Sequence, residues 1–387
     1  MAKRTVYLDH SATTPVDPRV LETMLPYFEK NYGNASSIHH MGREANVAVE
    51  ESREKIAHYL GAEPKEIIFT SGGTESDNTA IKGALKATDK KEAISSNIEH
   101  HAVLQPLEHL GQEGIKTTFI KVDDKGLINP NKVGKAITDN TGIVSIMHVN
   151  NEIGIINPIP QIAEVCHKHN VLFHSDTVQS TGKLPLNVDE LGVDFLSISA
   201  HKLYGPKGVG VLYARNGIDF TPFMEGGSQE RRRRGGTLNV PGIVGLGKAI
   251  ELAYEELDKN KAHIMALQQR LYKGLQEKFS NLISFNSDPD LGLYNIVNIS
   301  FELDGDKALD GEMLLLNLDI DGICCSNGSA CTSGAIEPSH VLLGIGRDEN
   351  TAKSSIRFSL GKDNNEEDID YTINSLEKIM SRMLKMV

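Results

Sequence analysis

The sequence predicts an α/β fold in which a mainly parallel sheet is covered by helices on both faces. Short apolar runs alternate with amphipathic stretches between Glu66 and Ala214, which is the pattern of strand–helix–strand units. Small and polar residues follow these runs, where sheets of this kind bind their ligands. After Gly236 the pattern changes to long helices and a few strands, which predicts a smaller second domain of α+β type.

The elements of the first part are predicted from their own residues. Five short apolar runs read as strands: EIIFT, IVSIMHV, VLFHSDTVQS, VDFLSIS and GVGVLYA. The segment SGGTESDNTAIKGAL predicts a helix that begins at the glycines, with Ser71 or Thr74 as its cap. The segment PIPQIAEVCHKHN predicts a helix that ends in basic residues.

The second part begins with a long helical pattern over residues 241–279, broken at most once, which connects the two domains. NIVNISFEL and SSIRFSLG predict strands, and an amphipathic helix closes the chain. We expect residues 1 to about 20 to pack back on this smaller domain. The expected division is a large domain of residues 16–255 and a small domain of residues 1–15 and 256–387.

The composition narrows the class of protein. Apolar residues make up 39% and charged residues 24% of the chain, as in soluble globular proteins. A formal net charge of −12 argues against general nucleic-acid binding and against binding to anionic membranes. The sequence has no run of about 18 apolar residues. Its start, MAKRTVYLDHSATTP, has no signal or transit character, so a cytoplasmic location is expected.

Three of the four cysteines, Cys324, Cys325 and Cys331, lie within eight residues. In a reducing cytosol we do not expect them to form structural disulfides. Their spacing lacks the C-x2-C pattern of zinc knuckles, which disfavours a metal site. We therefore expect these cysteines to be buried side chains or to include a reactive thiol. Cys166 lies on a predicted helix, and we expect it to be buried and inert.

The stretch SISAHKLYGPKG places Lys202 just after a predicted strand. Most lysines are solvated surface groups. A lysine at a strand end also suits phosphate binding or, when desolvated, Schiff-base chemistry. Ser199 and His201 beside it supply donors for a phosphate, and the glycines that follow allow a ligand to approach closely.

In HSDTVQS, Asp176 lies just past an apolar strand. The simplest reading is a turn or cap aspartate. The functional reading is a carboxylate that pairs with a protonated pyridine nitrogen, which pyridoxal phosphate enzymes need to keep the ring an electron sink. Gln179, three residues further on, is placed to donate a hydrogen bond to the phenolic oxygen of that ring.

Three more segments complete this set. The glycine-rich turn SGGTES opens a helix and offers free N–H groups to a phosphate. His100 in SNIEHHAV follows a predicted strand; alone it reads as a structural residue, but its ring also suits stacking on a pyridine. Asn151 in HVNNEIG ends another strand and suits a cofactor oxygen or a substrate carboxylate. A phosphate cradle, a strand-end aspartate and a strand-end lysine together predict pyridoxal 5'-phosphate.

Six motifs in one order make the chain resemble a known family. They are LDHSATTP, TSGGTESDN, HVNNEIG, SAHKLYGPKG, CSNGSACTSG and SSIRFSLG. The chain resembles the class I cysteine desulfurases, the NifS/IscS group, over nearly its whole length. The resemblance implies the fold of fold-type I pyridoxal phosphate (PLP)-dependent transferases in the class V aminotransferase group. That fold has a large domain with a mainly parallel seven-stranded sheet and a smaller α+β domain, and it forms a homodimer with its sites at the subunit interface.

The resemblance also implies roles for single residues. Lys202 resembles the lysine that binds the cofactor covalently, Asp176 the partner of the pyridine nitrogen and Gln179 that of the ring oxygen. His100 resembles the stacking residue and proton carrier. Thr237, in RRRRGGT, resembles the residue that reaches the phosphate from the other subunit.

A phosphate cup and a substrate clamp are implied in the same way. The cup residues are Gly73, Thr74, Ser199 and His201. Arg357, in SSIRFSLG, resembles the residue that binds the substrate carboxylate, with Asn151 assisting. An arginine suits this task because its planar fork binds a carboxylate through two parallel hydrogen bonds.

The segment GICCSNGSACTSGA is rich in small residues and predicts a mobile loop. Cys331 resembles the cysteine that takes sulfur from L-cysteine as a persulfide. Its thiolate is the nucleophile, so a nearby base or positive charge should lower its pKa. We expect Cys324 and Cys325 to be buried small residues, with at most one facing the site. The alternative is that Cys325 relays or protects the persulfide.

The function implied is the conversion of L-cysteine to L-alanine, with sulfur passed to acceptor proteins for iron–sulfur cluster assembly or tRNA thiolation. The chain ends just after the closing helix, without the longer tail that relatives devoted to iron–sulfur scaffolds often carry, which leaves the acceptor open. A selenocysteine lyase is an alternative function on the same fold. Selenocysteine lyases of this fold carry an R-x-G-H-H-C-A type of loop, whereas this chain has NGSACTS, which disfavours that function. A plain aminotransferase is a further alternative, but it would not need the thiol of Cys331. A protein that has lost catalysis would not need Lys202 or Arg357 either.

The run Arg231–Arg234 invites a nucleic-acid interpretation. Four basic residues in a chain of net charge −12 are too few to form the basic surface patch that nucleic-acid binding requires. A charged loop at the dimer interface, near the mouth of the site, is the better reading.

Overall fold

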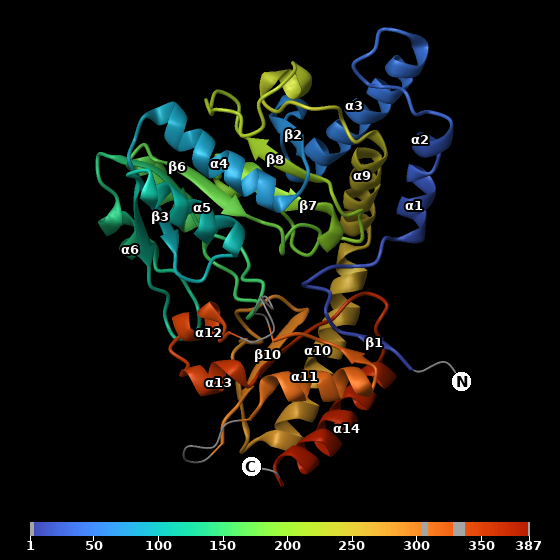
Figure 1. Ribbon diagram of the computed structural model, residues 1–387, viewed down its shortest axis with the longest axis vertical. Helices are drawn as coiled ribbons and strands as arrows, with labels where there is room; N and C mark the ends of the chain where they lie inside the picture. The colour runs from blue at the N-terminus through green and yellow to red at the C-terminus, as the bar shows by residue number, and fades with distance from the viewer. Residues whose placement is uncertain (1–3, 304–308, 328–336, 386–387) are drawn as a thin grey trace.

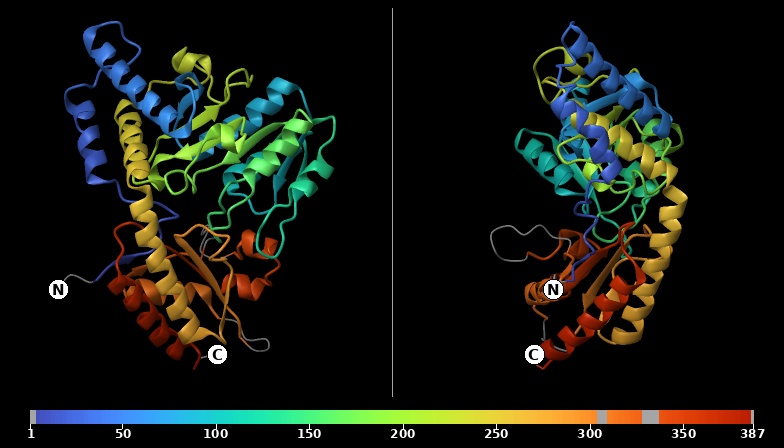
Figure 2. Two further views of the ribbon diagram at one scale, coloured as in Figure 1. Left: turned by 180° about the vertical axis from the view of Figure 1, so that it is seen from behind. Right: turned by 90° about the vertical axis from the view of Figure 1, so that its right-hand side faces the viewer.

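The protein is described from a computed structural model that covers residues 4–303, 309–327 and 337–385 and consists of two lobes (Figure 1). One lobe holds a seven-stranded sheet and the other a three-stranded sheet. Helices α9 (Val240–Glu255) and α10 (Leu257–Phe279) run along one edge of both lobes (Figure 2). Only Glu256 separates them, so the long helical pattern is broken once, as predicted.

The large sheet has the strand order β2-β8-β7-β6-β5-β3-β4. Its strands are β2 (Ile67–Thr70), β3 (Glu92–Ser96), β4 (Lys116–Ile120), β5 (Thr141–Ser145), β6 (Leu172–Asp176), β7 (Phe195–Ser199) and β8 (Gly210–Ala214). Strand β8 is antiparallel to both of its neighbours, and every other neighbouring pair is parallel. The predicted mainly parallel seven-stranded sheet is therefore confirmed.

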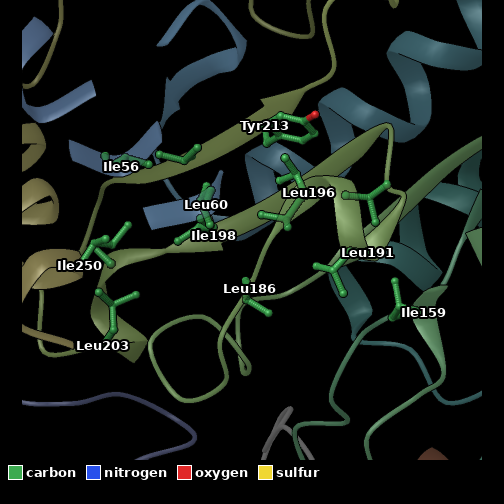
Figure 3. Packing of buried hydrophobic residues seen from close by; sticks show 14 of the residues in the cluster. Ile56, Leu60, Ile159, Leu186, Leu191, Leu196, Ile198, Leu203, Tyr213 and Ile250 are labelled. Atoms are coloured by element: carbon green, nitrogen blue, oxygen red, sulfur yellow. The ribbon is translucent and has the colours of Figure 1, made fainter. Parts of the chain in front are cut away.

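Residue alternation along the strands gives the sheet two apolar faces. In β7, Phe195 belongs to the cluster under α4 and α5, whereas Leu196 and Ile198 belong to the cluster on the opposite face. Figure 3 shows Ile198 on that second face with Leu60 of α3 and Ile250 of α9. Both clusters are needed because a strand buried on both faces must be covered on each.

The helices of the sheet lobe are α1 (Pro18–Met24), α2 (Pro26–Glu29), α3 (His40–Leu60), α4 (Gly73–Thr88), α5 (His101–Gln112), α6 (Pro130–Ala136), α7 (Ile159–Lys168) and α8 (Val188–Leu191). Helix α4 begins at the predicted glycines, but the prediction that Ser71 or Thr74 caps it is wrong. Its N-cap is Gly72, and no side chain accepts a hydrogen bond there. The predicted strand IVSIMHV also ends early, at Ser145, although Ile146 N and His148 N still donate to His174 O and Asp176 O of β6.

The other lobe contains the antiparallel sheet of β9 (Ile283–Phe285), β10 (Ile296–Phe301) and β12 (Ser355–Ser359) and the two-stranded pair β1 (Val6–Tyr7) with β11 (Ile323–Cys324). Its helices are α11 (Gly311–Ile320), α12 (His340–Gly344), α13 (Glu349–Lys353) and α14 (Glu366–Met383). Val6 and Leu8 join the core of this lobe, as predicted, but Val20 joins the core of the large sheet, so the prediction for residues 1 to about 20 is wrong for their last part.

The domain limits stay a prediction. Val341, Leu342 and Ala352 of α12 and α13 pack with the core of the large sheet, so apolar contacts cross between the lobes. None of the helices within the described residues is long and apolar enough to cross a membrane.

Candidate active site

A cavity of about 800 Å³ lies at the carboxyl ends of the parallel strands and is lined by residues of both lobes. It brings together most of the predicted site residues: Gly73, Thr74, His100, Asn151, Asp176, Gln179, Ser199, His201, Lys202 and Arg357. Thr237 is exposed and does not line this cavity within its own chain. Cys331 lies outside the described residues.

The predicted phosphate cradle is formed where β2 passes into α4. Gly72 leaves the start of the helix without a side-chain cap, so backbone N–H groups there are available to an anion. Ser199, at the end of β7, lies beside this turn: its Oγ is 3.7 Å from the place that a Cβ on Gly72 would take. Gly210 of β8 is packed against the same turn, since a Cβ there would lie 2.6 Å from Gly72 Cα.

Lys202 ends a short 3₁₀ turn, Ala200–Lys202, that directly follows β7. Its Nζ donates to the carbonyl oxygens of Ser11 at 2.6 Å and Ala12 at 2.7 Å. Burial, and then the charge of Arg357, lowers the pKa of Lys202 to about 8. A desolvated amine with a lowered pKa is nucleophilic near neutral pH, which is the property that a Schiff-base lysine needs.

Asp176 ends β6 and is 7% exposed. Its Oδ1 accepts a hydrogen bond from Val178 N at 2.8 Å. Burial, and then the neighbouring carboxyl of Asp77, raises the pKa of Asp176 to about 7. A buried carboxyl of this kind is stabilised in its charged form when a cation is placed against it.

Gln179 differs in detail from the prediction. Its Nε2 donates to Ser11 O at 2.9 Å, while its buried Oε1 has no hydrogen-bond partner among the described residues. Buried polar atoms are normally satisfied, so the free oxygen and the second N–H of the amide mark a place for a polar ligand group.

His100 is the N-cap of α5, and its Nδ1 accepts a hydrogen bond from Ala102 N at 3.1 Å. Burial, followed by the charge of Lys202, lowers the pKa of His100 to about 4. The ring is therefore neutral at physiological pH. Because Nδ1 is an acceptor, Nε2 carries the ring proton and is the nitrogen that exchanges protons with a ligand.

Arg357 reaches the cavity from β12 and is 4% exposed. Its Nη2 pairs with Asp9 Oδ1 at 2.8 Å, and its Nη1 donates to the carbonyl oxygen of Asn151 at 3.0 Å. Its buried Nε has no partner among the described residues. Asn151 therefore holds this arginine through its backbone, whereas the sequence predicts help from its amide side chain.

Among the lining residues that received no role from the sequence are Asp9, Ser11, Ala12 and Asp77. The motif LDHSATTP contains the first three. Asp77 lies four positions after Gly73 on α4, and this helical spacing places it on the same face as the phosphate cradle.

The cysteines are buried to different degrees. Cys166 lies on α7 and is fully buried, as predicted, and burial raises its pKa to about 12. Burial also raises the pKa of Cys325 well above its usual range, and this side chain packs against the core of the smaller lobe. Of the described residues around the cavity, Ser326 lines it but Cys324 and Cys325 do not. No cluster of ligands suited to a metal occurs among the described residues.

The arginine run lies in a strained loop. Glu230, Arg231 and Arg232 all have φ between 44° and 65°, a region that side chains disfavour. Buried Glu230 anchors the loop through Arg53, at 2.7 Å, and Arg234 pairs with Glu75 at 2.9 Å. Carboxylates of the same chain therefore neutralise part of the positive charge of the arginine run.

The residues of the cavity fit pyridoxal phosphate. An uncapped helix start suits its phosphate, the buried carboxyl of Asp176 suits its pyridine nitrogen, and the second N–H of the Gln179 amide suits its ring oxygen. The desolvated amine of Lys202 suits its aldehyde.

Known proteins resemble the chain over nearly its whole length. Cysteine desulfurase IscS from Dictyoglomus turgidum is 48% identical over 383 residues, which cover 98% of this chain and 96% of that protein. Cysteine desulfurase IscS from Methanosarcina thermophila is 46% identical over 385 residues, with 99% and 94% covered.

Solved structures and a family description agree. A NifS-like protein superposes with a TM-score of 0.91 at 39% identity, covering 98% of this chain and all of that chain. SspA, solved in complex with cysteine, gives a TM-score of 0.81 at 38% identity, with 92% and 99% covered. The class-V aminotransferase family matches residues 6–372. The chain therefore belongs to the class-V aminotransferases and, within that family, to the PLP-dependent cysteine desulfurases of the IscS/NifS type.

Proposed function

We propose that the protein takes sulfur from L-cysteine, leaves L-alanine, and holds the sulfur as a persulfide on Cys331 before passing it to an acceptor. The observation that carries the proposal is one cavity in which Lys202, Asp176 and Arg357 meet. The similarity to SspA, solved in complex with cysteine, supports the substrate.

The cofactor is held, in this proposal, by residues from several strand ends. The start of α4 with Gly73 and Thr74 binds the phosphate, helped by Ser199 and His201. Pyridoxal phosphate, when bound, supplies an electron sink for the negative charge that develops at the α-carbon of the amino acid.

Asp176 then faces the pyridine nitrogen, Gln179 the ring oxygen and His100 the face of the ring. Lys202 provides the covalent link. Each of these side chains lines the same cavity, which supports their acting on one ligand.

Arg357 binds the carboxylate of L-cysteine. Its guanidinium is fixed by Asp9 and by the carbonyl oxygen of Asn151, and its Nε is free to bind a carboxylate oxygen. This fixes the α-carbon relative to Lys202, which removes the α-proton as a base. A pKa of about 8 suits that step near neutral pH. His100 holds a proton at Nε2 for transfer to or from the substrate.

The sulfur transfer itself balances without an added oxidant. The thiolate of Cys331 attacks the substrate sulfur, so that an S–S bond forms and the C–S bond breaks. The electron pair of the C–S bond stays on carbon, which takes up a proton to become the methyl group of L-alanine. The role of Cys331 is supported by the motif NGSACTS and by the family.

The test measures alanine and protein-bound persulfide after the purified protein is mixed with L-cysteine. We expect one persulfide per active site without reductant, and turnover with sulfide release when a reductant is present. Lys202→Ala and Cys331→Ala should each abolish persulfide formation. A Cys331→Ala variant that still transfers sulfur at the full rate would overturn the assignment of the thiol.

We further propose that the protein acts as a cytoplasmic homodimer in which Thr237 of each chain reaches the phosphate site of the other. Thr237 is exposed and does not line the cavity of its own chain, which supports this arrangement. The acceptor is an iron–sulfur scaffold protein or a tRNA-thiolation protein. Sulfur transfer from the persulfide-loaded enzyme to each class of acceptor separates the two.

A further inference from the structure

A second carboxyl group, Asp77, faces the cavity together with Asp176. Both residues line it, and they are only 1% and 7% exposed. Asp77 stands on the first turns of α4, whereas Asp176 ends β6. The reaction described above uses Asp176 but gives Asp77 no task.

Among the described residues, burial and the Ser197 hydroxyl shift the pKa of Asp77, and no cation is among the causes. Its Oδ1 has no hydrogen-bond partner among the described residues, and His174 Nε2 lies 3.4 Å away. His174 is fully buried, with Nδ1 2.8 Å from Ser145 Oγ and Nε2 3.0 Å from Ser197 Oγ. Burial lowers the pKa of His174 to about 4, so its ring is neutral and supplies no counter-charge.

The other ionisable groups nearby differ in their effect. Glu99 is also fully buried, and burial raises its pKa to about 8, so it holds its proton at neutral pH. Val178 N, His174 and then Lys202 oppose the raised pKa of Asp176, whereas the Ser197 hydroxyl opposes that of Asp77. The positive charge therefore lies on the Asp176 side of the pair.

Two buried carboxyls that share one site do not both ionise near neutral pH, because each charge opposes the other. Burial raises the pKa of Asp77 to about 7, and burial with the neighbouring Asp77 does the same for Asp176. Since His174 lies two residues before Asp176 on the same strand face, the same neutral imidazole lies next to both carboxyls.

We propose that Asp77 and Asp176 form a carboxyl pair that shares one proton, and that Asp77 is a positioning residue that sets the negative charge Asp176 presents to the cofactor ring. At neutral pH the proton stays on Asp77 and the charge on Asp176, nearer to Lys202. As the pH rises, the proton leaves to solvent and a second negative charge appears beside the ring. The effect of Asp77 on the cofactor ring rests on the proposed function, whereas the sharing of a proton between Asp77 and Asp176 does not.

The holoenzyme provides the first test. A second carboxylate beside the ring should raise the pH midpoint at which the visible absorption of the bound cofactor changes. Asp77→Asn keeps the shape of the side chain but removes that charge, so we expect the midpoint to fall by about one pH unit. Asp89→Asn, the same change at the exposed end of α4, should leave it unchanged.

The second test is a double-mutant cycle on the full chain after the cofactor is removed. A carboxyl with a raised pKa binds more protons in the folded than in the unfolded state, so stability falls as the pH rises from about 4 to about 7. At pH 8.5, Asp77→Asn and Asp176→Asn should each raise the melting temperature by about 3 °C or more, and the double variant by less than their sum. At pH 5 the effects should be small and additive.

An unchanged absorption midpoint in Asp77→Asn, or additive effects at pH 8.5, would overturn the proposal. Asp77→Ser offers a second neutral replacement if Asn does not fold. The proposed function fails separately, if the wild-type protein forms no alanine from L-cysteine, because the thermal cycle requires neither cofactor nor substrate.

Discussion

At the scale of single residues, the candidate site depends on charges that are buried and only partly compensated. Arg357 shows this most clearly. It is 4% exposed, one terminal nitrogen pairs with Asp9, and its Nε has no partner among the described residues. A buried guanidinium with a free N–H group is ready to accept a carboxylate, since it gains the hydrogen bonds that it lacks.

Arg357→Lys keeps the charge but removes the planar fork. We expect the KM for L-cysteine to rise about 10- to 100-fold, which corresponds to the loss of one charge-assisted hydrogen bond, with a smaller change in kcat. Steady-state kinetics of alanine formation measure both constants. Arg382→Lys, on the exposed surface of α14, is the matched control and should behave as wild type. An unchanged KM in Arg357→Lys would mean that another residue binds the carboxylate of L-cysteine.

Cys325 leads to a second prediction at this scale. Its raised pKa keeps the thiol protonated, and a protonated thiol is a poor nucleophile. Cys325→Ser should therefore leave persulfide yield and sulfur transfer unchanged, in contrast to Cys331→Ala. Persulfide labelling with radioactive L-cysteine compares the variants. A slower transfer in Cys325→Ser would favour the relay that the sequence leaves open.

At the scale of elements, the site exists because strand ends and turns are packed closely. Gly210 begins β8, and a Cβ on it would lie 2.4 Å from Ile198 O and 2.6 Å from Gly72 Cα. Backbone atoms of the sheet cannot move aside cheaply, so the glycine is what allows β8 to approach the phosphate turn.

Gly210→Ala should push the turn at Gly72 out of place. We expect a loss of about 1–3 kcal/mol in the free energy of unfolding and a cofactor affinity at least about tenfold weaker, as 1.4 kcal/mol is a factor of ten. Denaturant unfolding and fluorescence titration with pyridoxal phosphate measure the two effects. Gly111→Ala, where a Cβ meets no atom within 4 Å, is the control and should not weaken the protein. Equal affinities in the two variants would contradict this role.

The elements also show what the sequence predicts well. The sequence predicts strands β2, β6, β7 and β8 because each contains a short run of large apolar residues that ends in polar or small ones. Helix α3 received no prediction, because its buried face includes small residues such as Ala45 and Ala48 among many charged ones, so its apolar periodicity is weak. The predicted strand IVSIMHV is longer than β5: Ile146 N and His148 N still donate to β6, but Met147 N donates to the Glu99 side chain.

At the scale of the whole molecule, the site is a meeting point of distant segments. Motifs predict which residues take part, because each strand end carries its own signal. They do not predict the pairing of Arg357 with Asp9 or the contact of Lys202 with Ser11, since 348 and 191 positions separate these partners. Such contacts follow from how the two lobes pack, which no local pattern contains. The pair Asp77–Asp176 lies within one lobe, where α4 packs on the end of β6, and no local pattern contains that contact either.

The last prediction concerns a face of the whole molecule that a single chain leaves open. Large apolar side chains are exposed along α1, α2 and the loop that follows: Leu21, Leu25, Phe28, Tyr32 and Ile38. Phe28 is 60% and Ile38 92% exposed. Monomeric proteins rarely expose apolar side chains in such a group, whereas a stable dimer buries about 800 Å² per partner.

We expect this face to lie in the interface of the proposed homodimer, in which Thr237 would reach the partner's phosphate site. The double variant Phe28→Asp with Ile38→Asp should sediment as a monomer and bind pyridoxal phosphate more weakly, because charged side chains oppose burial. Met265→Asp, an exposed apolar position on α10, should remain dimeric with normal affinity. A double variant that stays dimeric would place the interface elsewhere, and a wild-type protein that sediments as a monomer would remove the homodimer itself.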